Sequence, residues 1–319
     1  MQAKFSNASA GILRALICLI ISFSAYGFEQ KVFEEINHFF KKVNSDLYLD
    51  DAQIELFKKS KIESGFITKK HQIDIPYFLF KADQPTPEYV LYVGAIHADE
   101  FAPLYFSVNY LFDLMTKSQR SMKKNIIYIP LLDIDGFLEG IVKRGYPYRS
   151  NGSGIDLNRS FYAYDKLPHF KSTPENELVI HLIKKYSPQF WVIPHSSINI
   201  LDFDGLKDDI SSQWLRDVHE ATTVAGGEAI PIKDFRDYAP PSSLKNWSIG
   251  KLANHLGNVY SLTYEFSGPG KYPEADDPNR GSIIIKRKQL GRFEDTAWYA
   301  EMYFDQYKES MDTALFIND

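Results

Sequence analysis

The sequence has almost no cysteine and no clusters of basic residues. Cys18 is the single cysteine among 319 residues, so the chain cannot form an internal disulfide framework. Lysine and arginine are scattered, and the formal net charge is −5. An acidic chain without basic runs is a poor nucleic-acid binder. These absences exclude a disulfide scaffold and argue against a nucleic-acid partner.

Long apolar runs are also scarce, and the most apolar stretch lies near the N-terminus. Lys4 and Arg14 precede the apolar run Ala15–Phe23, and small residues occupy the −3 and −1 positions of a cleavage site after Gly27. This layout predicts a secretory signal peptide over residues 1–27, and therefore a periplasmic or secreted protein. An uncleaved anchor is the alternative, but the run is short for a membrane span of ~20 residues. We expect no stable membrane span after signal removal.

The mature chain is of a size that fits one main domain. Removal of the signal takes away two basic residues and no acidic residue, leaving 34 basic and 41 acidic residues and a net charge of −7. The remaining length suits a single α/β domain with small extensions.

Strand-like and helix-like segments alternate along the chain. Five apolar runs have the near-continuous pattern of strands buried on both faces, at 73–80, 89–96, 125–132, 190–194 and 259–266. Helical patterns follow them at 103–118, 174–186, 211–224 and 243–255. Thr173 and Pro174 have the residue types of an N-cap and a first helical turn. The alternation predicts an α/β fold: a three-layer sandwich around a central twisted, mixed, mostly parallel sheet.

The two ends of the mature chain have helical patterns of their own. Apolar residues recur at 3–4 spacing over residues 30–60, which predicts an amphipathic helix packed on the main domain. The tail 283–316 predicts one long helix, continuous or broken once, and residues 267–282 predict an exposed loop.

Four short motifs carry most of the ionisable residues that could perform chemistry. They are H-A-D-E at 97–100, R-S-N-G-S-G-I-D-L-N-R at 149–159, P-H-S-S at 194–197 and T-Y-E-F at 263–266. Three of them lie at or near the ends of predicted strands. Functional residues gather at the carboxyl ends of strands in α/β sheets, so we expect these motifs to share one site.

These motifs contain the donors of a catalytic metal site. Zinc bound for catalysis takes three nitrogen or oxygen ligands and leaves one position open, and His97, Glu100 and His195 can supply that set. Glu265 remains as a general base. If His97 and Glu100 stood alone, the simpler interpretation would be a helix-capping glutamate beside an unrelated histidine. The sequence does not decide between zinc and other divalent metals.

The order and spacing of the motifs resemble the zinc carboxypeptidases of the carboxypeptidase A family, over roughly residues 85–270. The match is closest to the compact bacterial branch that trims cell-wall peptides, in which an arginine precedes N-x-x-G-x-D-L-N-R by two residues, as Arg149 does. The resemblance implies a catalytic domain over 85–319, preceded by a helical and strand extension over 28–84. It also implies one zinc ion per chain.

The resemblance further implies roles for the residues of the 149–159 motif. Asn158 and Arg159 would hold the terminal carboxylate of the substrate, which a planar guanidinium can bind with two hydrogen bonds. Arg149 would polarise the scissile carbonyl, with Arg144 as the alternative.

The resemblance implies supporting roles for two more residues. Asp156 would orient His97 by accepting its second N–H. Tyr238 would cap bound substrate, although other tyrosines lie near the same loop.

The chain departs from the family pattern around the site. Asp133-Ile134-Asp135-Gly136 stands where Asn-Pro-Asp-Gly is usual, Ser160 replaces an asparagine, and Ile193 stands where an acidic residue is frequent. None of these changes removes a ligand or the base, but they alter the pocket.

The sequence therefore predicts an exported zinc carboxypeptidase acting on peptides with a free terminal carboxylate, with cell-wall (murein) peptides as the expected substrate. The first alternative is an N-acyl amino acid deacylase resembling succinylglutamate desuccinylase or aspartoacylase. A non-catalytic peptide-binding module is the second, although such relatives commonly lose a ligand or the base.

Overall fold

A computed structural model describes most of the predicted domain. The described residues are 34, 36, 38, 63–65, 75–116, 121–144, 147–161, 173–196, 200–224, 232–233, 247–266 and 304–318. The predicted signal peptide at 1–27, Tyr238 and the predicted loop at 267–282 lie outside them. Within the described ranges, none of the helices is both long and apolar enough to cross a membrane.

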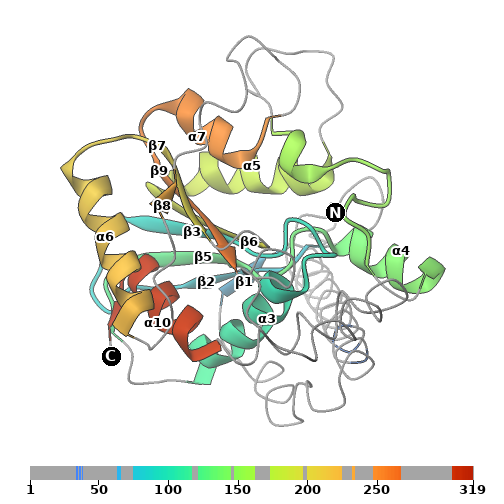
Figure 1. Ribbon diagram of the computed structural model, residues 1–319, viewed down its shortest axis with the longest axis horizontal. Helices are drawn as coiled ribbons and strands as arrows, with labels where there is room; N and C mark the ends of the chain where they lie inside the picture. The colour runs from blue at the N-terminus through green and yellow to red at the C-terminus, as the bar shows by residue number, and fades with distance from the viewer. Residues whose placement is uncertain are drawn as a thin grey trace, which may run out of the picture.

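A mixed eight-stranded sheet forms the centre of the molecule (Figure 1). Its strand order is β1-β2-β5-β3-β6-β9-β7-β8. The strands are β1 (Glu63–Gly65), β2 (Tyr77–Phe80), β3 (Tyr89–Val93), β5 (Asn125–Ile129), β6 (Phe190–Ser196), β7 (Ile200–Gly205), β8 (Ile232–Lys233) and β9 (Tyr260–Phe266). The central strands β5, β3, β6 and β9 are parallel to one another, whereas β2 and β7 pair antiparallel to β5 and β9.

Helices cover both faces of this sheet. The α-helices are α3 (Phe101–Thr116), α4 (Ile134–Arg144), α5 (Pro174–Tyr186), α6 (Asp209–Val224), α7 (Ile249–Leu256) and α10 (Phe304–Ala314). Helices α5 and α7 lie over one face, and α3 and α10 lie under the other (Figure 1). A small second sheet pairs β4 (Ser121–Met122) with β10 (Ile317–Asn318). The predicted three-layer α/β sandwich with a mixed, mostly parallel sheet is confirmed.

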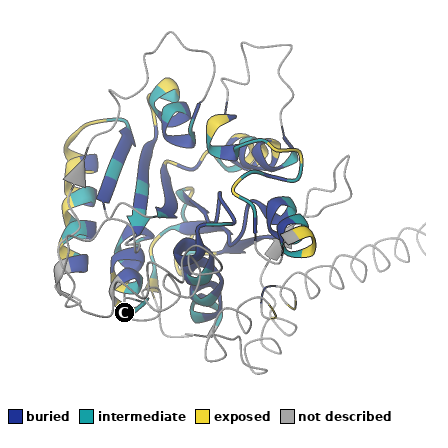
Figure 2. Ribbon diagram, turned by 45° about the vertical axis from the view of Figure 1, so that its right-hand side comes forward, coloured by how far each residue is buried: buried dark blue, intermediate teal, exposed yellow. Residues whose placement is uncertain are grey.

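The central strands are largely buried, and the helices turn their buried sides toward the sheet (Figure 2). Every residue of β2 and β5 is buried, which agrees with their continuous apolar sequences. Beneath β9, Phe266 stacks on Tyr307 of α10 and meets Phe106 of α3 edge-on, with ring centroids 4.2 and 5.1 Å apart. This aromatic packing joins the two helices to the strand that carries Glu265.

Local sequence signals set the ends of α5. Thr173 is its N-cap, with the side-chain oxygen accepting from the Asn176 N–H, and Pro174 opens the helix. Ser187 ends the helix in the left-handed conformation. The predicted bounds of this helix agree with the structure at both ends.

Helix α4 and strand β7 are among the elements that were not predicted. Helix α4 contains two glycines, which weaken its helical pattern, yet its apolar residues Ile134, Phe137 and Leu138 pack into the core. Strand β7 carries Asp202 and Asp204, which interrupt its apolar character. It is stabilised by antiparallel pairing with β9, a tertiary contact that local sequence does not encode.

The ends of the chain differ in part from the sequence predictions. Residues 34, 36 and 38, within the predicted N-terminal helix, are helical. Strands β1 and β2, from the predicted extension, join the same sheet as the rest of the chain. Residues 283–303 of the predicted C-terminal helix lie outside the described residues. Helix α10 forms the last part of that prediction and ends at Ala314, two residues before the predicted end, because the chain then turns to pair β10 with β4.

Candidate metal centre

The chain turns sharply between β3 and α3, and this turn presents the first two candidate ligands. Gly94 lies so close to the end of β5 that a Cβ atom would sit 2.5 Å from the Pro130 carbonyl oxygen. Ala95 then adopts a left-handed conformation with φ of 40°, a strained geometry that is found most often at functional sites. The His97 carbonyl accepts the Glu100 N–H at 3.2 Å, so both side chains leave one tight turn.

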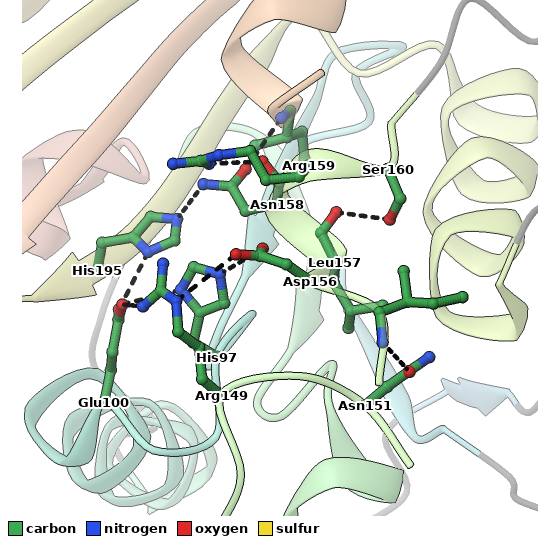
Figure 3. Close-up of polar contacts among 12 residues, drawn as sticks. His97, Glu100, Arg149, Asn151, Asp156, Leu157, Asn158, Arg159, Ser160 and His195 are labelled. Atoms are coloured by element: carbon green, nitrogen blue, oxygen red, sulfur yellow. Dashed lines mark hydrogen bonds and ion pairs between the residues drawn. The ribbon is translucent and has the colours of Figure 1, made fainter. Parts of the chain in front are cut away.

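His195 completes a three-residue group with His97 and Glu100. One candidate ligand atom from each of the three lies within 4.8 Å of the other two, and all three residues are buried or nearly so. The Glu100 carboxylate lies between the imidazoles, with Oε1 2.8 Å from His97 Nδ1 and Oε2 3.0 Å from His195 Nδ1 (Figure 3). Two imidazoles and one carboxylate form the nitrogen and oxygen donor set of a catalytic zinc site. These residues therefore fit a zinc ion.

The position of this group follows from the order of the strands. The chain passes from β3 to β5 on one side and then returns to β6 on the other side of β3. The site thus lies at the carboxyl ends of β3 and β6, at a topological switch point where open α/β sheets bind ligands.

Asp156 holds the second nitrogen of His97. Its Oδ1 lies 2.9 Å from His97 Nε2, as the sequence predicted for a residue that orients this histidine. Burial acts to lower the pKa of the His97 imidazole, but hydrogen bonds to Asp156 and Glu100 outweigh burial and raise it to about 9. Burial opposes ionisation of Asp156, yet contact with His97 lowers the pKa of its carboxyl.

Glu100 is surrounded by donors. Burial alone would raise the pKa of its carboxyl, but electrostatic interactions and hydrogen bonds with His195 and His97 hold that pKa well below its ordinary value. The Ser196 N–H and the Arg149 guanidinium also donate to Glu100, at 3.0 and 2.9 Å. These donors favour the ionised form of the Glu100 carboxylate.

Arg149 links the metal group to the loop that carries Asp156. Its Nη1 donates to Glu100, and its Nε lies 3.5 Å from Asp156 Oδ2. The side chain is about half exposed, at 47%. The guanidinium therefore contacts a candidate metal ligand and is also accessible to solvent. Arg144, the alternative, belongs to α4.

Asn151 shapes this loop, a role that sequence reasoning missed. Its Oδ1 accepts from the N–H groups of Ser153 and Ile155 at 3.1 and 3.0 Å, and Gly154 takes a φ of +76° in the same turn. The N-G-S-G sequence is a signal for such an Asx turn. The turn places Asp156 at the start of the short 3₁₀ helix η1 (Leu157–Arg159).

Asn158 and Arg159, predicted to hold a substrate carboxylate, lie in η1 beside His195. Asn158 Nδ2 is 3.1 Å from His195 Nε2, and Asn158 Oδ1 accepts from the Ile249 N–H at 3.1 Å (Figure 3). Arg159 is exposed, and its guanidinium donates to the Asn158 carbonyl at 2.8 Å. The sequence did not indicate that Asn158 would contact a candidate metal ligand.

Glu265 lies on β9 next to His195. The two residues are partners in the parallel register of β6 and β9. Tyr264 and Phe266 are fully buried, and because side chains alternate along a strand, Glu265 points to the opposite face from them. The structure thus brings the predicted ligands, Asp156 and Glu265 to one end of the sheet.

Comparisons with solved structures identify the fold. The thrombin activatable fibrinolysis inhibitor (TAFI) aligns with a TM-score of 0.60 and 15% identity, over 83% of this chain and 72% of that one. Carboxypeptidase A from Helicoverpa armigera aligns at 0.58 and 14%, with the same coverage. A metallo-carboxypeptidase from Pseudomonas aeruginosa aligns at 0.51 and 16%, over 83% and 67%. The chain has the metallocarboxypeptidase fold.

This likeness is one of fold and not of sequence. No protein-family model matches the chain, and the comparison with curated proteins gives no match. A metallocarboxypeptidase fold with 14–16% identity is consistent with the resemblance inferred from the four motifs. The chemistry must be argued from the residues themselves.

Proposed function

We propose that this protein is a zinc-dependent carboxypeptidase that hydrolyses the amide bond next to a free terminal carboxylate. One observation carries the proposal: His97, Glu100 and His195 converge within 4.8 Å at the switch point of the sheet. The metallocarboxypeptidase fold and the position of Glu265 beside His195 support it.

The mechanism assigns each step to a side chain. A zinc ion held by the three ligands would supply Lewis acidity and lower the pKa of a bound water to about 7. Glu265 accepts a proton from the attacking water and returns it to the leaving amine. Arg149 donates to the carbonyl oxygen as negative charge develops there.

Residues of η1 orient the substrate. Arg159 is exposed and next to Asn158, so its guanidinium can form a two-point contact with the terminal carboxylate of a peptide. Asp156 keeps His97 in place by accepting from Nε2. Tyr238 is proposed to cap the bound substrate.

We further propose that the substrate is a cell-wall peptide and that the protein is exported. The signal-like residues 1–27 and the N-x-x-G-x-D-L-N-R motif support this part of the proposal. N-terminal sequencing of the protein purified from its native host should find Phe28 first. An intact Met1 on a cytoplasmic protein would contradict export.

The activity test uses zinc-loaded protein and three substrate classes. Peptidoglycan fragments with free terminal carboxylates, the same peptides as terminal amides, and N-acyl amino acids are incubated in parallel, and the products are identified by mass spectrometry. Release of terminal residues from the free peptides alone supports the proposal. Cleavage of N-acyl amino acids alone indicates the deacylase, and full zinc occupancy without turnover of any class indicates a binding module.

A further inference from the structure

The orientation of the Asn158 amide is fixed by its partner on α7. A backbone N–H can only donate, so the atom of Asn158 that faces Ile249 N at 3.1 Å must be the oxygen, Oδ1. The amide nitrogen Nδ2 therefore faces His195 Nε2, also at 3.1 Å. Nδ2 is a donor only, so His195 Nε2 acts as the acceptor.

This contact implies that the proton of a neutral His195 lies on the other ring nitrogen, Nδ1. A neutral imidazole has one N–H and one acceptor nitrogen. With Nε2 accepting from Asn158, the proton lies on Nδ1, where Glu100 Oε2 accepts it at 3.0 Å. His97 is arranged differently, because its Nε2 faces the carboxylate of Asp156.

The two histidines thus differ in how they are prepared for ligation. A ligating nitrogen needs its lone pair, and a histidine that ligates through Nδ1 usually donates Nε2–H to a carboxylate, a carbonyl or water. Asp156 offers His97 such an acceptor. Asn158 instead faces His195 Nε2 with an amide N–H. If Nε2 also carried a proton, two N–H groups would face each other, and they cannot form a hydrogen bond.

The Asn158 amide bridges Ile249 N and His195 Nε2. We infer that this Asn158 bridge and ligation of a metal ion through His195 Nδ1 exclude each other, so that metal binding releases the Asn158 amide nitrogen from His195. The Ile249 end of the bridge stays in place, because Ile249 is the buried first residue of α7 and its N–H would lose its acceptor. The released Nδ2 can then donate to another acceptor beside Arg159, the next residue of η1.

This makes Asn158 a positioning residue with two alternative partners. The first partner is His195. This step rests on the proposed function: the second partner is the terminal carboxylate of the substrate, which can accept a hydrogen bond from Nδ2. The carboxylate clamp is then complete only when His195 ligates a metal ion. Metal binding and substrate binding are coupled through one amide.

The first test reads the ring nitrogens of His195 directly. Nitrogen-15 NMR of full-length protein, stripped with a chelator and then titrated with Zn²⁺ alone, distinguishes the two tautomers. We expect the proton on Nδ1 without zinc and on Nε2 with zinc, with a simultaneous shift of the Asn158 side-chain amide. His97, held by Asp156, should keep its Nε2 proton throughout. An Nε2 proton on His195 in the zinc-free protein would overturn the inference.

The second test measures zinc affinity by competition with a chelator. Asn158→Asp keeps an oxygen for the Ile249 N–H and offers another to His195 Nε2–H, so we expect zinc to bind about tenfold more tightly, within the range of effects of such outer partners. Asn158→Ala removes the competing donor without adding charge and should also tighten binding. The matched control, Asp156→Ala, should weaken zinc binding about 10–100-fold. Equal or weaker binding by both Asn158 variants would overturn the inference.

The third test uses N-acetylglycine as a probe for the clamp, with its amide as the control ligand. The acid should perturb the Asn158 amide signal in zinc-loaded protein only. Perturbation of equal size without zinc would contradict the coupling. These readouts do not depend on turnover: a tautomer change without peptidase activity would refute the proposed function alone, and activity with an unchanged tautomer would refute this inference alone.

Discussion

His195 and Glu265 are register partners on neighbouring parallel strands, β6 and β9. Residues paired in this way point to the same face of a sheet, on strands about 4.8 Å apart. The sheet itself therefore places the proposed base next to a candidate ligand. A shift of one residue in this register would turn Glu265 to the face occupied by Phe266. The proposed reaction therefore requires this register.

Replacement of Glu265 by glutamine tests the base. The change preserves size but removes the group that accepts the proton, and a positioned base contributes about 10²–10⁴-fold. We expect kcat to fall by that factor while zinc content stays constant. The measurement is kcat on a peptidoglycan peptide, with zinc quantified in the same sample. Normal turnover by a zinc-loaded variant would show that another residue is the base.

The metal ligands are tested by His97→Ala and His195→Ala. Wild-type protein should hold about one zinc ion per chain, and each variant should lose most of it, because three protein ligands are needed for a catalytic site. Elemental analysis after dialysis gives the occupancy. His181→Ala is a matched control, since His181 is exposed on α5 and should leave zinc content unchanged. Full occupancy in both ligand variants would mean that the ligands lie elsewhere.

Arg159→Lys tests the carboxylate clamp. A lysine keeps the positive charge but loses the planar two-point contact, so KM for a free peptide should rise about tenfold or more. Terminal amidation of the substrate should have a similar effect on wild-type enzyme. Steady-state kinetics of both substrates with both proteins checks this. If amidated and free peptides react equally fast, the enzyme does not recognise a terminal carboxylate.

Asp133→Asn tests a buried carboxyl group at the start of α4. Burial raises the pKa of Asp133 well above its ordinary value, although its Oδ1 accepts from the Gly136 N–H. Because the folded chain binds this proton more tightly than the unfolded chain does, stability falls as pH rises between the two pKa values. The fall is about 1.4 kcal/mol for each pH unit in that window.

The asparagine variant should not show this loss, since it keeps the acceptor for Gly136 and cannot ionise. Its free energy of unfolding relative to wild type should therefore increase from pH 4 to pH 8, as measured by urea denaturation. A constant difference between the two proteins across this range would show that Asp133 titrates normally.

Much of the fold could be predicted because its signals are local. The apolar sequences of β3, β5, β6 and β9 identify buried strands, and Thr173 with Pro174 fixes the start of α5. Strand β7 and the end of α10 could not be predicted, because pairing with β9 and β4 decides them.

The candidate site divides in the same way. The four motifs predicted that His97, Glu100, His195 and Glu265 would share one site, the family resemblance added Asp156, and the structure brings these residues to one end of the sheet. The sequence did not indicate the roles of Asn151 and Ser196, which act through turn geometry and a backbone N–H. It also gave no sign of the contact between Asn158 and His195, which are 37 positions apart in the chain.

The sequence by itself therefore determined which donors are available and which segments become strands and helices, since residue chemistry and hydrophobic pattern are local properties. Only the tertiary structure decided which nitrogen of each histidine faces which partner. That choice depends on the positions of Glu100, Asp156 and Asn158 and on a single N–H at the start of α7, which the chain supplies from a distant segment. Hydrogen bonding is directional, and so the proton arrangement of the site is a property of the folded molecule.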